Sequence, residues 1–228
     1  MTLKRRKNKS LKGWIKGLTE RKASWKDVLS SSERYLYAGD ITRPELFKDY
    51  YGLSINKNNR THILHDLNKK FPLPNNCIDR FISEDVFEHI ELNQIPIILD
   101  EIHRVLKPNG LLRIGLPDYR FDIYKERSFY DSKGNIVFDP DGGGRFANWK
   151  VLGGGHVWFP TFETVQKLLT NSKFETEKIQ FLHYYSPEGE SVTRSIDYSV
   201  GHISRTPDND ARANNPYRAM SIVVDVRK

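Results

Sequence analysis

Two carboxylates and an imidazole lie close together near the middle of the chain. Asp85, Glu88 and His89 are spaced i, i+3 and i+4, so they share one face if a helix begins there. Carboxylate oxygens and an imidazole nitrogen can bind a divalent cation such as Mg²⁺ or Mn²⁺. We therefore predict a metal site at Asp85, Glu88 and His89. The structural alternative is that Glu88 and His89 hydrogen-bond to the backbone and to neighbouring strands.

Two further side chains are candidates for acid–base chemistry. His156 follows a run of three glycines and precedes three apolar residues, and Asp118 comes directly after an apolar run. The unperturbed pKa of histidine, about 6.5, suits a general base, and a carboxylate can act as a base or anchor a substrate. We predict His156 and Asp118 as catalytic residues. Aromatic packing of His156 and loop capping by Asp118 are the structural alternatives.

Short apolar runs alternate with helical patterns from Glu33 onward, which is typical of βαβ units and a parallel sheet. One helix should begin near Pro96, because a proline is well tolerated in the first turn, and end at 107–110, where Pro-Asn-Gly cannot continue it. A second helix is predicted over 161–170. The predicted strands cover 34–38, 51–55, 62–65, 80–83, 111–116, 175–181 and 220–226.

Residues 118–160 have no clean periodicity and are rich in glycine, aspartate and aromatic residues. A long irregular insertion in an α/β domain is usually a functional loop or a disordered one. Its two glycine runs lack the Gly-Lys-Ser/Thr ending of a P-loop. We expect this insertion to cap the substrate site, with the glycines acting as hinges.

The stretch from His65 to Tyr119 carries four motifs in order: HDL at 65–67, FPLPNNCID at 71–79, ISEDVFEHI at 82–90, and EIHRVLKPNG followed by LLRIGLPD over 101–118. With this spacing, the chain resembles the class I S-adenosylmethionine-dependent methyltransferases, in their type-11-like branch. The resemblance implies a Rossmann-like α/β fold with a seven-stranded, mostly parallel sheet and helices on both faces. It also implies S-adenosylmethionine as the cofactor.

The resemblance assigns cofactor-binding roles to residues at the ends of the predicted strands. Asp66 would accept a hydrogen bond from the adenine amino group, with Leu67 in apolar contact, although Asp66 could instead cap a turn. The other implied positions are Ala38, Gly39, Ser54, Ser83, Glu84 and Asp85. Spacing like that of Asp85, Glu88 and His89 also occurs in O-methyltransferases of the ubiquinone pathway, where it holds a metal.

Two of these positions depart from the family pattern. The glycine-rich turn after the first strand has the single glycine Gly39, although such glycines allow the backbone to approach a cofactor closely. Ser54 stands where the family has an acidic residue that binds the ribose hydroxyls. Serine can hydrogen-bond a hydroxyl, but without the help of a charge. Both departures bear on cofactor binding.

Charge is concentrated at the start of the chain. Ten Lys or Arg residues lie within 1–27 against Glu20 and Asp27, whereas the other residues sum to about −1 of the total net charge of +7. We assign 1–32 to a basic extension, helical over 11–29, and 33–228 to the methyltransferase domain. The extension could bind nucleic acid or an anionic surface, or pack its apolar stripe on the domain.

The remaining composition limits the cellular setting. At 228 residues the chain is long enough for one domain, and no apolar run approaches the roughly 18 residues of a membrane span. Cys77 is the single cysteine, which excludes an intramolecular disulfide and favours a reducing compartment. We predict a cytoplasmic protein.

Three functions are compatible with these observations. The first is an O-methyltransferase acting on a small molecule, a sugar or a glycan, which rests on the resemblance. The second is a nucleic-acid methyltransferase that uses the basic extension, although Ser83-Glu84-Asp85-Val86 stands where an Asn-Pro-Pro-Tyr-like motif would be. The third is a binding module that kept the fold and lost the chemistry.

Overall fold

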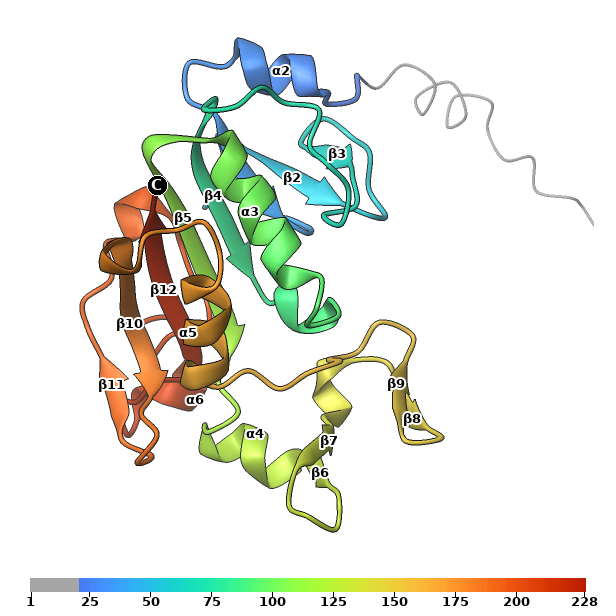
Figure 1. Cartoon of the computed structure of the whole chain (residues 1–228), viewed down its shortest axis with the longest axis vertical. Helices are drawn as coiled ribbons and strands as arrows, with labels where there is room; N and C mark the ends of the chain where they lie inside the picture. Colours follow the sequence, from blue (N-terminus) through green and yellow to red (C-terminus); the bar gives the residue numbers. More distant parts are fainter. Residues whose placement is uncertain (1–20) are drawn as a thin grey trace, which may run out of the picture.

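A computed structural model describes residues 21–228, and its main element is an eight-stranded sheet with the order β11-β10-β12-β5-β4-β1-β2-β3 (Figure 1). Strands β3, β2, β1, β4 and β5 are parallel, and β12 is antiparallel to both β5 and β10. This topology confirms the predicted Rossmann-like fold. The strands are β1 (Tyr35–Ala38), β2 (Tyr50–Ser54), β3 (His62–Leu64), β4 (Ile78–Glu84), β5 (Leu106–Pro117), β10 (Ile179–Tyr185), β11 (Ser191–Thr193) and β12 (Ser221–Arg227).

The sheet differs from the prediction at one edge. It has eight strands and not seven, because the chain turns back after β10 and adds the short strand β11, with the backbone N–H of Ser186 donating to Glu190 O at 2.8 Å. Strand β10 also begins later than predicted. The short 3₁₀ helix η3 (Thr176–Lys178) takes the charged first part of that segment, and its apolar second part is buried.

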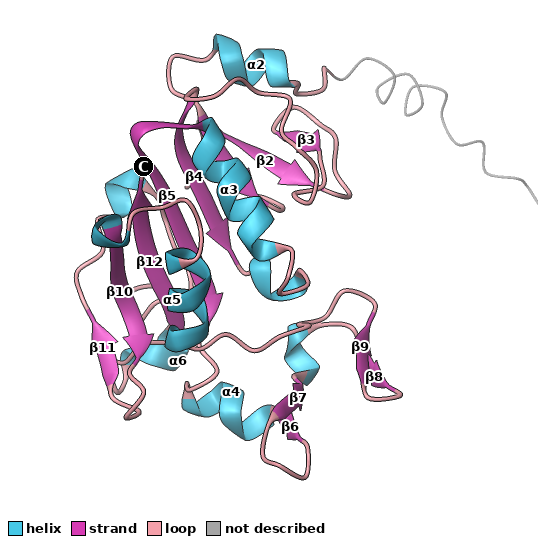
Figure 2. Ribbon diagram, in the orientation of Figure 1, coloured by secondary structure: helices cyan, strands magenta, loops and turns pink. Residues whose placement is uncertain are grey.

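Two helices cover one face of the sheet (Figure 2). Helix α3 (Ile95–Val105) buries Ile98 and Ile102, and α5 (Phe162–Thr170) buries Val165 and Leu169. They pack against the apolar side chains of β1, β4, β5 and β12 in one continuous core. Both helices lie where the sequence predicts them. Residues 107–110 bulge from β5, since its pairing with β4 jumps from Leu106 to Leu111, in line with the predicted break.

Irregular segments, and not long helices, cover much of the opposite face. Segment 39–49 and the region between β11 and β12, which includes η4 (Tyr198–Val200), pack on it. Ala213 of α6 (Ala211–Asn214) packs instead with Tyr124 and Met220. The fully buried Arg113 ties this region to the sheet. Its guanidinium is bidentate to Asp225 at 2.6 and 2.7 Å and also donates to the carbonyls of Asp197, at 2.8 Å, and Gly201.

The segment over 118–160, called the cap below, extends away from the sheet (Figure 1). It contains α4 (Asp122–Arg127), the hairpins β6 (Phe129–Tyr130)–β7 (Ile136–Phe138) and β8 (Arg145–Ala147)–β9 (Lys150–Leu152), and η2 (Pro140–Gly142). These strands have only two or three residues each, which is too short to give a visible period in the sequence.

At the N-terminal end, α2 (Trp25–Ser30) begins with a capping box formed by Ser24 and Asp27. The Trp25 ring packs edge-on against His65 at 5.1 Å. Most of the predicted basic extension, residues 1–20, lies outside the described residues, so its predicted helix and its anionic partners stay predictions. Within 21–228, no helix has the length and apolar character to cross a membrane.

Candidate cofactor and active site

A cavity of about 1110 Å³ opens where β1, β2, β3 and β4 end. Open α/β sheets bind ligands at the carboxyl ends of their strands. Its walls include seven of the eight predicted cofactor positions, namely Ala38, Gly39, Ser54, Asp66, Leu67, Glu84 and Asp85. The eighth, Ser83, is buried within β4 and is not part of the wall.

Gly39 forms the turn after β1. Its φ of +84° lies in the left-handed region, and its N–H donates to Leu53 O at 2.8 Å. A Cβ at this position would lie 3.1 Å from Val86 Cγ2, which is tighter than an ordinary contact. A single glycine is therefore enough to form the turn. Because it has no side chain, its backbone is accessible from the cavity.

Ser54 and Asp40 lie at the ends of neighbouring strands. The Ser54 hydroxyl accepts hydrogen bonds from the backbone N–H groups of Asn56 and Lys57 at 3.0 and 2.9 Å, so it is already used as a turn cap. Asp40 also lines the cavity, and its Oδ2 pairs with Lys57 Nζ at 2.8 Å. Burial opposes ionisation, but the Lys57 hydrogen bond holds the pKa of Asp40 below its ordinary value. Its Oδ1 is buried, and no described atom hydrogen-bonds to it.

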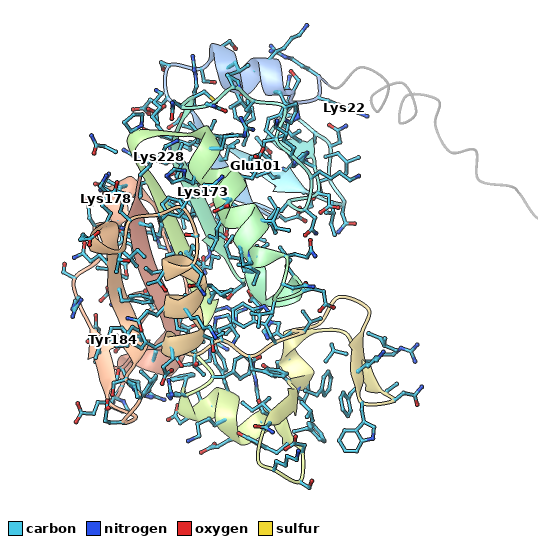
Figure 3. All side chains as sticks on the ribbon, viewed as in Figure 1. Lys22, Glu101, Lys173, Lys178, Tyr184 and Lys228 are labelled. Carbon is cyan, nitrogen blue, oxygen red and sulfur yellow. The ribbon has the colours of Figure 1, made fainter. Side chains whose placement is uncertain are left out.

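The predicted adenine contacts follow β3. Asp66 Oδ1 accepts from the backbone and side chain of Asn68 at 3.0 and 3.1 Å, and this carboxylate forms part of the cavity wall beside Leu67. A side chain of α3 holds the segment that follows β3 in place. Glu101, labelled in Figure 3, accepts from the Phe71 N–H at 2.7 Å. Asp66 thus caps a turn through one oxygen and is placed to meet a ligand.

Glu84 and Asp85, after β4, hold a segment from the far end of the chain. Glu84 Oε1 accepts from the N–H groups of Ser204 and Arg205 at 2.7 and 2.8 Å, and Arg205 Nε pairs with Asp85 Oδ2 at 2.6 Å. Burial and the neighbouring Asp85 charge raise the pKa of Glu84 to about 7. Arg205 therefore lies in the cavity wall, and the two carboxylates position it.

The structure brings Glu88 and His89 together with His156 of the cap, while Asp85 faces Arg205. His89 lines the cavity, and its Nδ1 is 2.8 Å from Gly154 O. His156 is buried behind it, and burial together with the nearby His89 lowers the pKa of His156 to about 3. Gly142 permits this packing, since a Cβ there would meet the His156 ring at 2.8 Å.

Asp118, the other predicted catalytic residue, lies elsewhere. It is fully buried outside the cavity wall, and its two oxygens accept from the backbone N–H groups of Arg120 and Tyr185 at 3.0 and 2.7 Å. Burial raises the pKa of Asp118 to about 6. These contacts support the loop-capping alternative, because Asp118 joins the start of the cap to β10.

Part of the chain, and its fold, are similar to known proteins. Residues 33–114 match the model of the methyltransferase domain family. The matched segment, about a third of the chain, is similar to a methyltransferase domain. The fold of the chain resembles that of an S-adenosylmethionine-dependent methyltransferase from Methanosarcina mazei, with 14% identity, a TM-score of 0.51 and coverage of 89% of this chain and 95% of the other. None of the curated proteins searched matches it.

Two further solved structures have the same fold. An S-adenosylmethionine-dependent methyltransferase from Mesorhizobium loti has 15% identity and a TM-score of 0.50, with 88% of this chain and 93% of the other covered. One from Thermotoga maritima has 14% identity and a TM-score of 0.50, with 89% and 84% covered. At these identities the likeness concerns the fold alone.

Several cavity residues escaped the sequence analysis. Asp40 directly follows Gly39, but nothing in the local sequence marks it as a ligand contact. Arg205 lies in a segment without periodicity far along the chain, and the structure places it in the cavity wall. Gly154 reaches the cavity from the cap, which no local pattern could reveal.

Proposed function

We propose that this protein is a methyltransferase that binds S-adenosylmethionine in the cavity and transfers its methyl group to a hydroxyl of a sugar or glycan. The observation that carries the proposal is the convergence of seven predicted cofactor residues on one cavity at the strand ends. Ligand pockets usually measure about 300–1,000 Å³. A cavity of about 1110 Å³ therefore has room for the cofactor and an acceptor together.

The wall chemistry supports a division of the cavity between the two ligands. Leu53 and Leu67 offer apolar surface beside Asp66, which suits an adenine ring with its amino group on the carboxylate. Asp40 Oδ1 supplies the charged acceptor that Ser54 does not offer, so we assign the ribose hydroxyls to Asp40. A hydrogen bond to a charged group is roughly twice as strong as a neutral one.

The acceptor side is polar. The turn after β4 and the 204–205 segment contribute Asp85, His89, Glu91, Gln94 and Arg205 to the wall. This mixture of donors and acceptors suits a ligand with several hydroxyl groups. It supports a small sugar or a glycan end as the methyl acceptor.

The reaction requires an in-line approach and a base. The acceptor oxygen forms a bond to the methyl carbon while the carbon–sulfur bond breaks, and sulfur keeps the electron pair as S-adenosylhomocysteine forms. The hydroxyl proton must go to a base. Because Gly154 O can only accept, His89 Nδ1 carries a proton and Nε2 has a free lone pair. We assign His89 to the acceptor side of the reaction, where its Nε2 lone pair can either take this proton or bind a cation. His156 lies behind His89, and Asp118 holds the start of the cap against β10.

The proposal also includes a divalent cation beside the acceptor, for which Mg²⁺ and Mn²⁺ are the candidates from sequence. The placement of Glu88 and His89 beside the cavity supports a cation there. We place the reaction in the cytoplasm, since Cys77 is a free thiol.

The test is transfer of labelled methyl groups from S-adenosylmethionine to a panel of monosaccharides, nucleotide sugars, oligosaccharides and oligonucleotides. We expect the label to appear in an acceptor that contains a sugar. The labelled product should be stable to base, because a methyl group on a hydroxyl forms an ether. Transfer to oligonucleotides alone, with activity that falls steeply as salt rises, would instead support the nucleic-acid function.

A pair of histidine variants tests the site within the same assay. His89→Asn should lower turnover by about 10²–10⁴-fold, the usual contribution of a general base. The matched control is His103→Asn, because His103 lies on α3 against Phe174, with ring centres 5.0 Å apart, outside the cavity wall. Equal loss in both variants would contradict the assignment of His89.

A further inference from the structure

Three potential ligand groups from two distant segments converge beside the cavity. Glu88 and His89 belong to η1 (Phe87–His89), directly after β4, and His156 comes from the end of the cap. One donor atom from each lies within 4.8 Å of the other two. His156 Nε2 is 3.6 Å from Glu88 Oε1, and the His89 and His156 ring centres are 4.7 Å apart.

The carboxylate of Glu88 is buried without a hydrogen-bond partner among the described residues. The whole side chain is fully buried, and the lack of a partner holds for both carboxylate oxygens. The 3.6 Å separation from His156 Nε2 is too long for a hydrogen bond. Buried polar atoms are partnered in the great majority of cases, so this carboxylate needs an explanation.

Both imidazoles are oriented by contacts at their Nδ1 atoms. His89 Nδ1 donates to Gly154 O, as described above. At His156, Nδ1 is 2.5 Å from the Tyr119 hydroxyl, which lies 2.7 Å from Asp139 Oδ2. Asp139 in turn accepts from Arg127 at 2.6 Å.

These contacts determine the tautomer of His156. The Arg127 pairing and the Tyr119 hydrogen bond outweigh burial and lower the pKa of Asp139, so Asp139 is an acceptor. Tyr119 therefore donates to Asp139, and His156 Nδ1 donates to Tyr119. Each ring keeps the lone pair on Nε2. Metal-binding histidines usually have this pattern, in which the second nitrogen donates to a carbonyl or to a carboxylate-linked group.

The donor set indicates which metals fit. Two imidazoles and one carboxylate suit zinc and its neighbours in the first transition row, whereas Mg²⁺ prefers oxygen ligands. Tetrahedral ligands bonded to Zn²⁺ at about 2.0–2.1 Å lie about 3.3 Å from one another. The observed 3.6 Å between Glu88 and His156 needs only a small contraction to reach that value.

We propose that Glu88, His89 and His156 bind a divalent transition-metal ion of the zinc class, which links the cap to the end of β4. This inference rests on the proposed function for the ion's position beside the acceptor, and it replaces Asp85 and Mg²⁺ or Mn²⁺ of the sequence-based expectation. Asp85 is paired with Arg205 and is not one of the three converging groups. With the ion bound, His89 Nε2 is a ligand and not the base. The three protein ligands leave one position for water or for the acceptor oxygen, whose proton the ion would make easier to remove.

The test measures metal binding directly on the full-length chain. The protein is stripped with a chelator, and Zn²⁺ is added, with Co²⁺ as a second probe because its visible absorption reports the ligand geometry. We expect one ion per chain, a tetrahedral or five-coordinate Co²⁺ spectrum, and a rise in thermal stability on adding Zn²⁺. A folded wild-type chain that binds neither ion would overturn the proposal.

Three variants separate the two ligand sets. Glu88→Gln and His156→Ala should each weaken Zn²⁺ binding by about a hundredfold or more, since even a lost outer-shell partner costs about 10–100-fold. Asp85→Asn is the matched control and should bind Zn²⁺ as wild type does. Loss of binding in Asp85→Asn but not in His156→Ala would show that the ligand set is wrong.

Two controls keep the outcome interpretable. Circular dichroism of each stripped variant shows whether it folds, and His89→Asn provides a second ligand deletion if His156→Ala does not fold. Calorimetric titration of the stripped wild type with S-adenosylmethionine is run in parallel. Cofactor binding without metal binding would refute this inference alone, whereas the reverse result would refute the proposed function.

Discussion

Replacing Gly39 by alanine tests whether the turn after β1 is a cofactor-binding turn. At a φ of +84°, a residue with a Cβ pays about 1–2 kcal/mol of backbone strain. For a chain of this size, that corresponds to a fall in Tm of about 2–8 °C. The new Cβ would also lie 3.1 Å from Val86 Cγ2, so Val86 must move by a few tenths of an ångström.

The substitution should harm cofactor binding beyond its effect on stability. Gly39 and Val86 both line the cavity, so an added methyl group and a displaced Val86 narrow the surface that the cofactor approaches. We expect S-adenosylmethionine to bind about tenfold more weakly or worse, which is about 1.4 kcal/mol. Calorimetry measures the dissociation constant, and differential scanning calorimetry measures the Tm.

Gly134→Ala is the matched control. Gly134 has a φ of +81° in the turn between β6 and β7, and no described atom lies within 4 Å of a Cβ built there. It should lose a similar amount of stability and keep wild-type cofactor affinity. If the two variants bound S-adenosylmethionine with the same affinity, whether that affinity was the wild-type value or a weakened one, the assignment of Gly39 to the cofactor site would be refuted.

Three other substitutions probe the surroundings of the cavity. Arg113→Leu should lower the free energy of unfolding by about 3–5 kcal/mol in urea titrations, because it leaves the Asp225 carboxylate and the carbonyls of Asp197 and Gly201 without their partner; a loss below about 1 kcal/mol would argue against that network. Asp40→Asn should weaken S-adenosylmethionine binding with little change in Tm, and unchanged affinity would remove Asp40 from the ribose site. The folded pKa of Asp118, about 6, is raised above the ordinary value of about 3.9, so its contribution to stability is present near pH 4 and lost as pH rises through 6. Asp118→Ala should therefore destabilise the protein more at pH 4.5 than at pH 7, and urea titrations with the opposite trend would contradict the raised pKa.

Much of the fold could be predicted because its signals are local. Apolar runs mark the strands, and Pro96 and the Pro-Asn-Gly break mark the two ends of a helix, so each signal lies within or next to its own element. The motifs over 65–118 then indicate the order of these strands and helices. The edge strand β11 was missed because it has three residues and depends on pairing with β10. The hairpins of the cap were missed for the same reason.

The candidate site was harder to predict because its geometry depends on one backbone angle and on distant contacts. The spacing of Asp85, Glu88 and His89 predicts a shared face only on an α-helix. In the structure, Asp85 has a φ of 53° and precedes a 3₁₀ turn, so its carboxylate faces Arg205 and not the other two side chains. The third partner, His156, approaches from the cap, and no local pattern links it to Glu88.

The central claim is that the cavity at the ends of β1–β4 is an S-adenosylmethionine site. Calorimetric titration of the full-length chain with S-adenosylmethionine, and then with S-adenosylhomocysteine in competition, tests it most directly. The account predicts micromolar binding of one cofactor per chain, with the product displacing the substrate. A folded chain that binds neither molecule, with or without Zn²⁺, would contradict the account and leave a methyltransferase fold with another ligand.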